Sequence, residues 1–404
     1  MARSLSLTAY RALSWGGQHA HGDMHAARPD GQLVWFHATT PERLSALQDL
    51  SGRLLQQSPE LNVLFTRPPA SESRRWPRHL LGAIELPQDH PAATRDFMRH
   101  WHPDVCIWTG GSLQPNLIAQ TSEQQIPMIL LGAVENELHL RRHRWLPDLL
   151  RTTLDCFDMI LADSEASARY VRRSGISSGK VSVSSALQVS PNPRPWPEEE
   201  LVETNQVLAG RPVWLSAWSQ DSEFISILIA HRHALRFLHR LLLVLHVADP
   251  NEADPLKARL KAMDLRCADW DAGDEIEDST QVVLSTVAEN LELWYRVAPV
   301  TFLGSSLEPG AGGQNPLTAV SLGSAVLYGS NVQGHIDTYA RLASAGAARA
   351  VRNADALGAG VVQLLAPDQA ASVALAGWQV VTEGAHLTDQ LIDLIQNKLD
   401  KQDQ

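Results

Sequence analysis

Short apolar runs alternate with helix-like segments along the whole chain, and this alternation limits the folds open to it. In the first half, Leu33–His37 predicts a strand, and Pro41–Gln57 predicts a helix because its leucines recur at helical spacing. The same half predicts further strands at Asn62–Phe65, Val105–Trp108, Pro127–Leu131, Met159–Ala162 and Val181–Val183, with helices between most of them. Such a pattern is typical of an α/β fold with a doubly wound parallel sheet.

A proline-rich stretch interrupts this alternation near the middle of the chain. Residues 191–200, PNPRPWPEEE, contain four prolines and end in three acids, a composition that disfavours regular structure. The alternation then resumes at Val213–Ala217 and ends in two predicted helices, Asp368–Glu383 and Leu387–Leu399. We therefore expect two Rossmann-like domains that face a central cleft, 1–190 and 201–404, with 191–200 as the linker. The last helix is a candidate for packing back on the first domain.

Composition excludes several classes of function. The net charge is −11, from 34 basic and 45 acidic residues, which argues against a nucleic-acid partner. Cys106, Cys156 and Cys267 lie far apart, form no CxxC pair and predict reduced thiols. No HExxH motif occurs, and we expect no metal site. The first 17 residues lack a long apolar run and no stretch approaches 18 apolar residues, so we expect a cytoplasmic chain without a signal peptide or membrane span.

A glycine-rich loop follows the predicted strand that ends at Leu303. It holds Gly304, Gly310, Gly312 and Gly313, and it leads into Asn315 and Pro316, which favour the start of a helix. Free backbone N–H groups at a helix N-terminus attract phosphate or carboxylate groups. The loop chemistry alone fits an anion site and an ordinary strand-to-helix turn equally well.

A longer segment around this loop resembles a known family. Residues 294–317, WYRVAPVTFLGSSLEPGAGGQNPL, are similar to the motif YxxAxVxFVGGSLxPxGGHNPLEP of the Kdo (3-deoxy-D-manno-octulosonic acid) transferases, which are GT-B glycosyltransferases of lipid A assembly. The resemblance extends from about Leu33 to Gly384. Its supporting matches are VWFHA at 34–38, QPNL at 114–117, LADSEASARY at 161–170 and WLSAWSQDSE at 214–223.

This resemblance implies an activity and a set of site residues. The activity is the transfer, with inversion, of Kdo or a related sugar from a CMP-sugar to a lipid A-type acceptor, without a cofactor. Glu42 matches the family's general base; alternatively, it only favours the N-terminus of its own helix. The donor-binding residues would be Ser219, Gln220, Gly304, Ser305, Ser306, Gly312, Gly313, Gln314, Asn315 and Thr318. The acceptor-binding residues would be Thr39, Thr40, Arg67 and Asn116.

Several positions depart from the family pattern. Thr318 stands where the family has a carboxylate, and the segments 132–136 and 246–250 each lack an arginine that would pair with an anion.

Two other functions therefore stay open: a GT-B transferase with another nucleotide sugar or a soluble acceptor, and a non-catalytic relative that binds a nucleotide or a partner. The expected partners are a nucleotide sugar and a lipid-linked or glycan acceptor, with a peripheral contact at the inner membrane face. The basic run Arg141–Arg144 fits either a lipid phosphate or a solvated helix surface.

Overall fold

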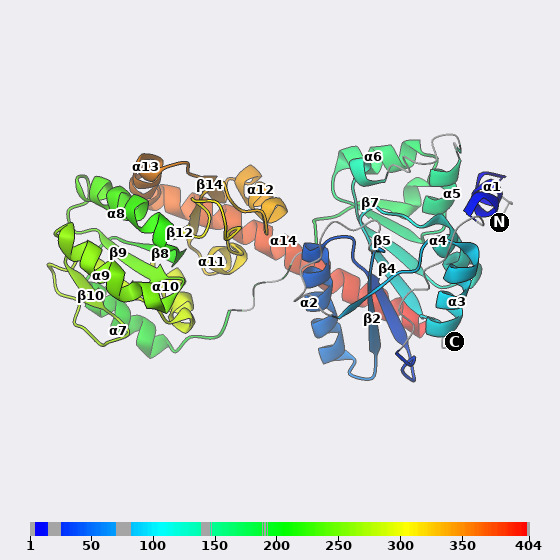
Figure 1. Ribbon diagram of the computed structural model, residues 1–404, viewed down its shortest axis with the longest axis horizontal. Coiled ribbons are helices and arrows are strands. Elements are labelled where there is room, and N and C mark those ends of the chain that lie inside the picture. Colours follow the sequence, from blue (N-terminus) through cyan, green and yellow to red (C-terminus); the bar gives the residue numbers. More distant parts are fainter. Residues whose placement is uncertain are drawn as a thin grey trace. The chain divides into compact units, whose positions relative to one another are not determined.

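The chain forms two compact units. The computed structural model describes residues 5–14, 26–69, 82–138, 146, 148–187, 189, 191 and 193–401. Unit 1 comprises Met1–Val189 and Gly384–Gln404, and unit 2 comprises Ser190–Glu383. Each unit is built around one seven-stranded sheet in which all paired strands run parallel (Figure 1). The predicted class, two doubly wound α/β sheets, is confirmed.

The sheet of unit 1 has the strand order β3-β2-β1-β4-β5-β6-β7. Its strands are β1 (Leu33–His37), β2 (Asn62–Arg67), β3 (Ala83–Glu85), β4 (Val105–Thr109), β5 (Met128–Ala133), β6 (Met159–Ala162) and β7 (Val181–Val183). Its helices, before the C-terminal one, are α1 (Leu5–Ser14), α2 (Pro41–Gln57), α3 (Pro91–Trp101), α4 (Pro115–Glu123), α5 (Leu149–Asp155) and α6 (Glu165–Arg173). The chain order reverses between β1 and β4, so this sheet has its switch point there.

The sheet of unit 2 has the order β10-β11-β9-β8-β12-β13-β14, with its switch point between β8 and β12. Its strands are β8 (Val213–Ser219), β9 (Leu242–Val247), β10 (Cys267–Asp269), β11 (Val282–Ser285), β12 (Val300–Leu303), β13 (Ala325–Tyr328) and β14 (Ala348–Ala350). Its helices are α7 (Glu198–Leu208), α8 (Asp221–Leu235), α9 (Ala253–Ala262), α10 (Leu291–Val297), α11 (Leu317–Ser321), α12 (Ile336–Ser344) and α13 (Ala354–Leu364).

Apolar side chains cover both faces of each sheet. In β1, Leu33 and Trp35 join one core cluster, whereas Val34 and Phe36 join the cluster on the opposite face. In β8, Leu215 and Trp214 divide between two clusters in the same way. Burial on both faces explains why these strands are continuous apolar runs rather than alternating ones.

The last helix, α14 (Pro367–Asp400), is one uninterrupted helix that runs from unit 2 into unit 1 (Figure 1). Val380 packs in a core cluster of unit 2, while Leu387, Leu391 and Ile395 pack in a cluster of unit 1. The prediction of two separate helices here is wrong. A single glycine in a helix, here Gly384, costs only about 1 kcal/mol, and the packing on both sides outweighs this cost.

Other local differences follow from the same limits of sequence patterns. The acidic end of the predicted linker is helical, since α7 begins at Glu198. The three acidic residues Glu198–Glu200 lie in its first turn, where their negative charges interact favourably with the helix dipole. The edge strands β10 and β14 have three residues each and no apolar run to predict them.

Among the described residues, no helix has both the length and the apolar character needed to cross a bilayer.

Gly384→Ala should raise the stability of the protein. An added Cβ at Gly384 would meet nothing within 4 Å, so the substitution only removes the cost of glycine in a helix, about 1 kcal/mol. The matched control is Gly377→Ala in the same helix, where the Cβ would lie 2.5 Å from Cγ1 of Val320. Thermal denaturation should show a higher midpoint for the first variant and a lower one for the second. A lower unfolding midpoint for Gly384→Ala would contradict the helical conformation of residue 384.

Candidate functional site

The switch point of unit 2 brings two loops together, one after β8 and one after β12. Parallel sheets of this kind bind ligands at the carboxyl ends of strands on either side of such a point. The β12 loop passes so close to the β8 loop that a Cβ at Gly304 would lie 2.8 Å from the carbonyl oxygen of Trp218. The backbone contact therefore requires glycine at this position, and the two loops form one structural element.

Two residues of these loops adopt left-handed backbone conformations. Trp218 has φ 56° and Ser305 has φ 57°, which is uncommon for residues other than glycine. The Ser305 hydroxyl donates to the Trp218 carbonyl oxygen (2.8 Å) and accepts from Nε2 of Gln220 (2.8 Å). The Trp218 backbone N–H donates to Nδ1 of His246 (3.3 Å). Side chains thus hold this unfavourable geometry in place, as is common at functional sites.

His246 is neutral in this arrangement. Burial lowers its pKa to about 4, and an accepting Nδ1 places the proton of the neutral ring on Nε2. Its ring also packs edge-on against Trp218, with 5.0 Å between the ring centroids.

The buried carboxylate of Glu223, in the first turn of α8, fills the start of the glycine loop. Its Oε2 accepts from the backbone N–H groups of Ser305 (2.6 Å) and Gln220 (3.1 Å). Its Oε1 accepts from those of Ser306 (3.0 Å) and Leu307 (2.7 Å). The expectation that this loop presents free N–H groups is therefore wrong for residues 305–307. Each such charge-assisted bond contributes about 1.5–3 kcal/mol, which offsets the cost of burying the charge.

The second half of the loop has a different character. The N–H of Gly313 donates to the carbonyl oxygen of Ser305 (2.8 Å). Within the described part of the chain, no hydrogen bond is donated by the backbone N–H groups of Glu308, Gly310, Ala311, Gly312, Gln314 or Asn315. The first three of these residues are exposed and the last three are partly exposed. The backbone N–H groups of the loop that remain open to a ligand therefore lie between Glu308 and Asn315.

The remaining predicted donor residues differ in accessibility. Ser219 is buried, and its hydroxyl lies 2.8 Å from that of Ser216. Thr318 is partly exposed in the short helix α11. This helix begins at Leu317, later than predicted, although the side chain of Asn315 accepts from the Leu317 N–H (3.0 Å) as a cap would.

The switch point of unit 1 lies beside the loop between β1 and α2. The Thr40 hydroxyl caps α2 by accepting the backbone N–H of Arg43 (3.3 Å), and the Thr39 hydroxyl donates to the Thr109 carbonyl oxygen (3.0 Å). The Arg43 guanidinium donates to both carboxylate oxygens of Glu137 (2.8 and 3.0 Å) and to the Thr39 hydroxyl (2.6 Å). Both predicted threonines therefore support the loop. Arg43 and Glu137, which the sequence did not single out, fix its position.

Glu42 is exposed in the first turn of α2, immediately after this loop. Among the described residues, none forms a hydrogen bond or salt bridge with its carboxylate. A carboxylate in such a position can accept a proton from an approaching hydroxyl group.

The other two predicted acceptor residues lie in different surroundings. Arg67 forms a salt bridge with Glu85 (2.6 Å) at the end of β2. Asn116 is fully buried in α4 and donates its side-chain amide to the Asp89 carbonyl oxygen (2.6 Å). The basic run Arg141–Arg144 lies outside the described residues. Among the residues that are described, no group of three or more His, Cys, Asp or Glu side chains is placed to hold a metal ion.

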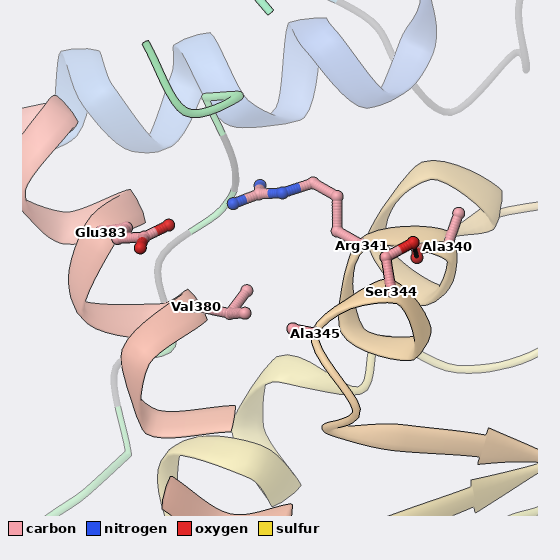
Figure 2. Close-up of a pocket in the computed structure, with 6 residues that line it drawn as sticks. All are labelled: Ala340, Arg341, Ser344, Ala345, Val380 and Glu383. Atoms are coloured by element: carbon pink, nitrogen blue, oxygen red, sulfur yellow. Dashed lines mark hydrogen bonds between the residues drawn. The ribbon is translucent and has the colours of Figure 1, made fainter. Parts of the chain in front are cut away.

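A separate pocket of about 420 Å³ lies between α12 and α14 in unit 2. Figure 2 shows Arg341 extending from α12 toward the part of α14 that carries Val380 and Glu383. Burial lowers the pKa of Arg341, and the nearby charge of Glu383 opposes this shift. The pocket contains none of the predicted site residues.

Comparisons with known proteins agree with this architecture. A family model described as 3-deoxy-D-manno-octulosonic-acid transferase (kdotransferase) matches residues 15–190. The 3-deoxy-D-manno-octulosonic acid transferase of Bordetella pertussis is 29% identical over 395 residues, covering 93% of this chain and 89% of the relative. That of Haemophilus influenzae is 25% identical over 387 residues, covering 93% and 90%.

A solved structure supports the fold. The crystal structure of Acinetobacter baumannii MurG aligns with a TM-score of 0.50 at 13% identity, covering 91% of this chain and 100% of that protein. The two doubly wound sheets and these matches define a glycosyltransferase with the GT-B fold. Within this class, the chain is a Kdo-transferase-like protein.

His246→Asn should make the stability of the protein less dependent on pH. Because the pKa of His246 is about 4 in the folded chain and its ordinary value is 6.5, only the unfolded chain takes up this proton as the pH falls from 6.5 toward 4. Its stabilising contribution is complete above pH 6.5 and declines below it, by at most about 1.4 kcal/mol per pH unit.

The measurement is the unfolding midpoint between pH 7.5 and 5. Asparagine can still accept the Trp218 N–H through Oδ1 but does not titrate, so the midpoint of this variant should fall less on acidification than that of the wild type. The control is His239→Asn, which changes an exposed histidine of the same unit. Equal pH profiles for His246→Asn and the wild type would show that His246 does not contribute to the acid sensitivity.

Proposed function

We propose that this chain transfers Kdo or a related sugar from a CMP-sugar to a lipid A-type acceptor, with inversion at the sugar. The observation that carries the proposal is the similarity to Kdo transferases over 93% of the chain. It is combined with a loop at the switch point of unit 2 whose conformation is held by hydrogen bonds to the Glu223 carboxylate. The proposed acceptor is lipid-linked, so the proposal includes a peripheral contact with the cytoplasmic face of the inner membrane.

The donor would bind at the switch point of unit 2. Gly312, Gly313, Gln314 and Asn315 belong to a part of the loop whose N–H groups mostly lack acceptors among the described residues. Such groups stabilise a leaving phosphate. Gln220 and Ser305 would border the site, with Gly304, Ser306, Ser219 and Thr318 supporting its shape. Because the segments 132–136 and 246–250 lack the arginines of the family pattern, these backbone groups would supply positive potential to the donor site in an acidic chain.

The acceptor would bind at unit 1, where Glu42 is the proposed general base. Its carboxylate would remove the proton from the acceptor hydroxyl, which then attacks the sugar and displaces CMP. Thr39 and Thr40 support the loop in front of Glu42, and the Arg43–Glu137 pair fixes it. Arg67, although paired with Glu85, is the proposed contact for an acidic group of the acceptor, whereas the buried Asn116 would act by shaping the interior.

A panel of nucleotides should stabilise the protein selectively. Thermal-shift measurements with CMP, UDP, GDP and ADP should show a rise in the unfolding midpoint with CMP, because a ligand that binds the folded state adds its binding free energy to stability. Stabilisation by UDP or GDP instead would favour a GT-B transferase with a different donor. No shift with any nucleotide would count against the donor site.

Glu42→Gln should abolish most of the turnover but leave nucleotide binding unchanged. General base catalysis contributes about 10²–10⁴-fold to rate, so kcat should fall within that range while the CMP-induced thermal shift persists. The control is Glu198→Gln, which removes an exposed first-turn acid of α7. If the Glu42 carboxylate only stabilises its helix by interacting with the helix dipole, both variants will lose a little stability and neither will lose turnover.

A further inference from the structure

Glu223 is the most completely hydrogen-bonded buried charge in unit 2 among those that the structure describes. Its residue is 1% exposed, and its carboxylate takes two backbone N–H groups on each oxygen. A ring of N–H groups that converge on one point is the geometry with which proteins bind phosphate or carboxylate ligands. Here a side chain of the protein itself occupies that ring.

The carboxylate joins two segments that are far apart in sequence. The N–H of Gln220 belongs to the start of α8, and the other three belong to the turn after β12. The first segment leaves β8 and the second leaves β12, the two strands that border the switch point. Glu223 thus holds together the two edges of the proposed donor site.

The neighbouring contacts fix the same turn from its other side. The Ser306 hydroxyl accepts the N–H of Gly329 (2.8 Å), and the Ser306 carbonyl oxygen accepts the N–H of Asn331 (2.8 Å). A Cβ at Gly329 would lie 2.1 Å from that carbonyl oxygen, so the loop after β13 packs directly on the turn. With its amides satisfied internally, the turn keeps its conformation without a ligand.

We propose that Glu223 is a positioning residue of the donor site: its carboxylate, and not a ligand, fills the amide ring at 305–307 and sets the positions of Gln220 and Ser305. This inference rests on the proposed function of unit 2. It follows that a donor phosphate does not bind at residues 305–307. It binds farther along the loop, where the N–H groups of Gly312, Gln314 and Asn315 have no hydrogen-bond acceptor among the residues that the structure describes.

The test is Glu223→Gln, which keeps the size of the side chain but replaces one carboxylate oxygen with an NH₂ group. That group cannot accept from the two amides it faces, so part of the ring loses its acceptor. The matched control is Asp269→Asn at the edge strand β10, where the carboxylate accepts the N–H groups of Asp271 (3.1 Å) and Ala272 (3.2 Å) and pairs with Lys257. Both variants remove a carboxylate that binds loop amides in unit 2, but only one borders the switch point.

Hydrogen exchange gives a readout that is independent of catalysis. The amides of residues 305–307 should be protected in the wild type and in Asp269→Asn, and should exchange at least about tenfold faster in Glu223→Gln. Unchanged exchange in Glu223→Gln would overturn the claim that this carboxylate holds the turn.

Binding and kinetics distinguish a positioning role from a purely structural one. With CMP, or with whichever nucleotide stabilises the wild type, the affinity of Glu223→Gln should fall about tenfold, equivalent to about 1.4 kcal/mol. The donor KM should rise by a similar factor, and the acceptor KM should stay unchanged. Faster exchange with wild-type affinity and donor KM would show a structural turn only and overturn the proposal. A wild type that binds no nucleotide would instead overturn the proposed function, and the donor-site role of Glu223 with it.

Discussion

Parallel strand pairing is the constraint on which the rest of this structure depends. Parallel neighbours cannot be joined by tight hairpins, so each connection crosses over a face of the sheet, usually through a helix. Both faces are then buried, and the loops after the strands gather at one edge of each sheet. The location of both candidate sites follows from this rule, because each lies where the chain order reverses, at β1 and β4 in one unit and at β8 and β12 in the other.

Several charged side chains near the two switch points interact with partners within the protein. Arg43 forms a salt bridge with Glu137, Arg67 forms one with Glu85, and the buried Glu223 carboxylate accepts hydrogen bonds from backbone amides. These contacts hold loops in place, and among the described residues they pair the guanidinium groups of Arg43 and Arg67 with carboxylates of the protein itself. In the proposed donor site of unit 2, open backbone N–H groups would supply positive potential without adding a charged residue. An enzyme of this type would depend on loop geometry more than on arginine pairs.

The sequence predicted long elements better than short ones. The apolar runs of β1, β4 and β8, and the leucine spacing of α2, were sufficient because burial on one or two faces imposes a residue pattern. The edge strands β10 and β14 carry no such pattern, since their pairing uses backbone groups alone. The break placed at Gly384 failed for a related reason: a glycine weakens a helix slightly, whereas Leu387, Leu391 and Ile395 stabilise it through contacts that only the folded chain contains.

The sequence by itself determined the two α/β sheets, the family resemblance and the glycine loop, because each depends on the order and types of residues along the chain. The tertiary structure decided what the loop amides bind. Glu223 lies more than 80 residues before Ser305, and only the folding of α8 beside the β12 turn places its carboxylate in the amide ring. It likewise decided that Asn116 is buried and Glu42 exposed. Accessibility and hydrogen-bond partners are properties of the packed chain, and residue patterns constrain them only weakly.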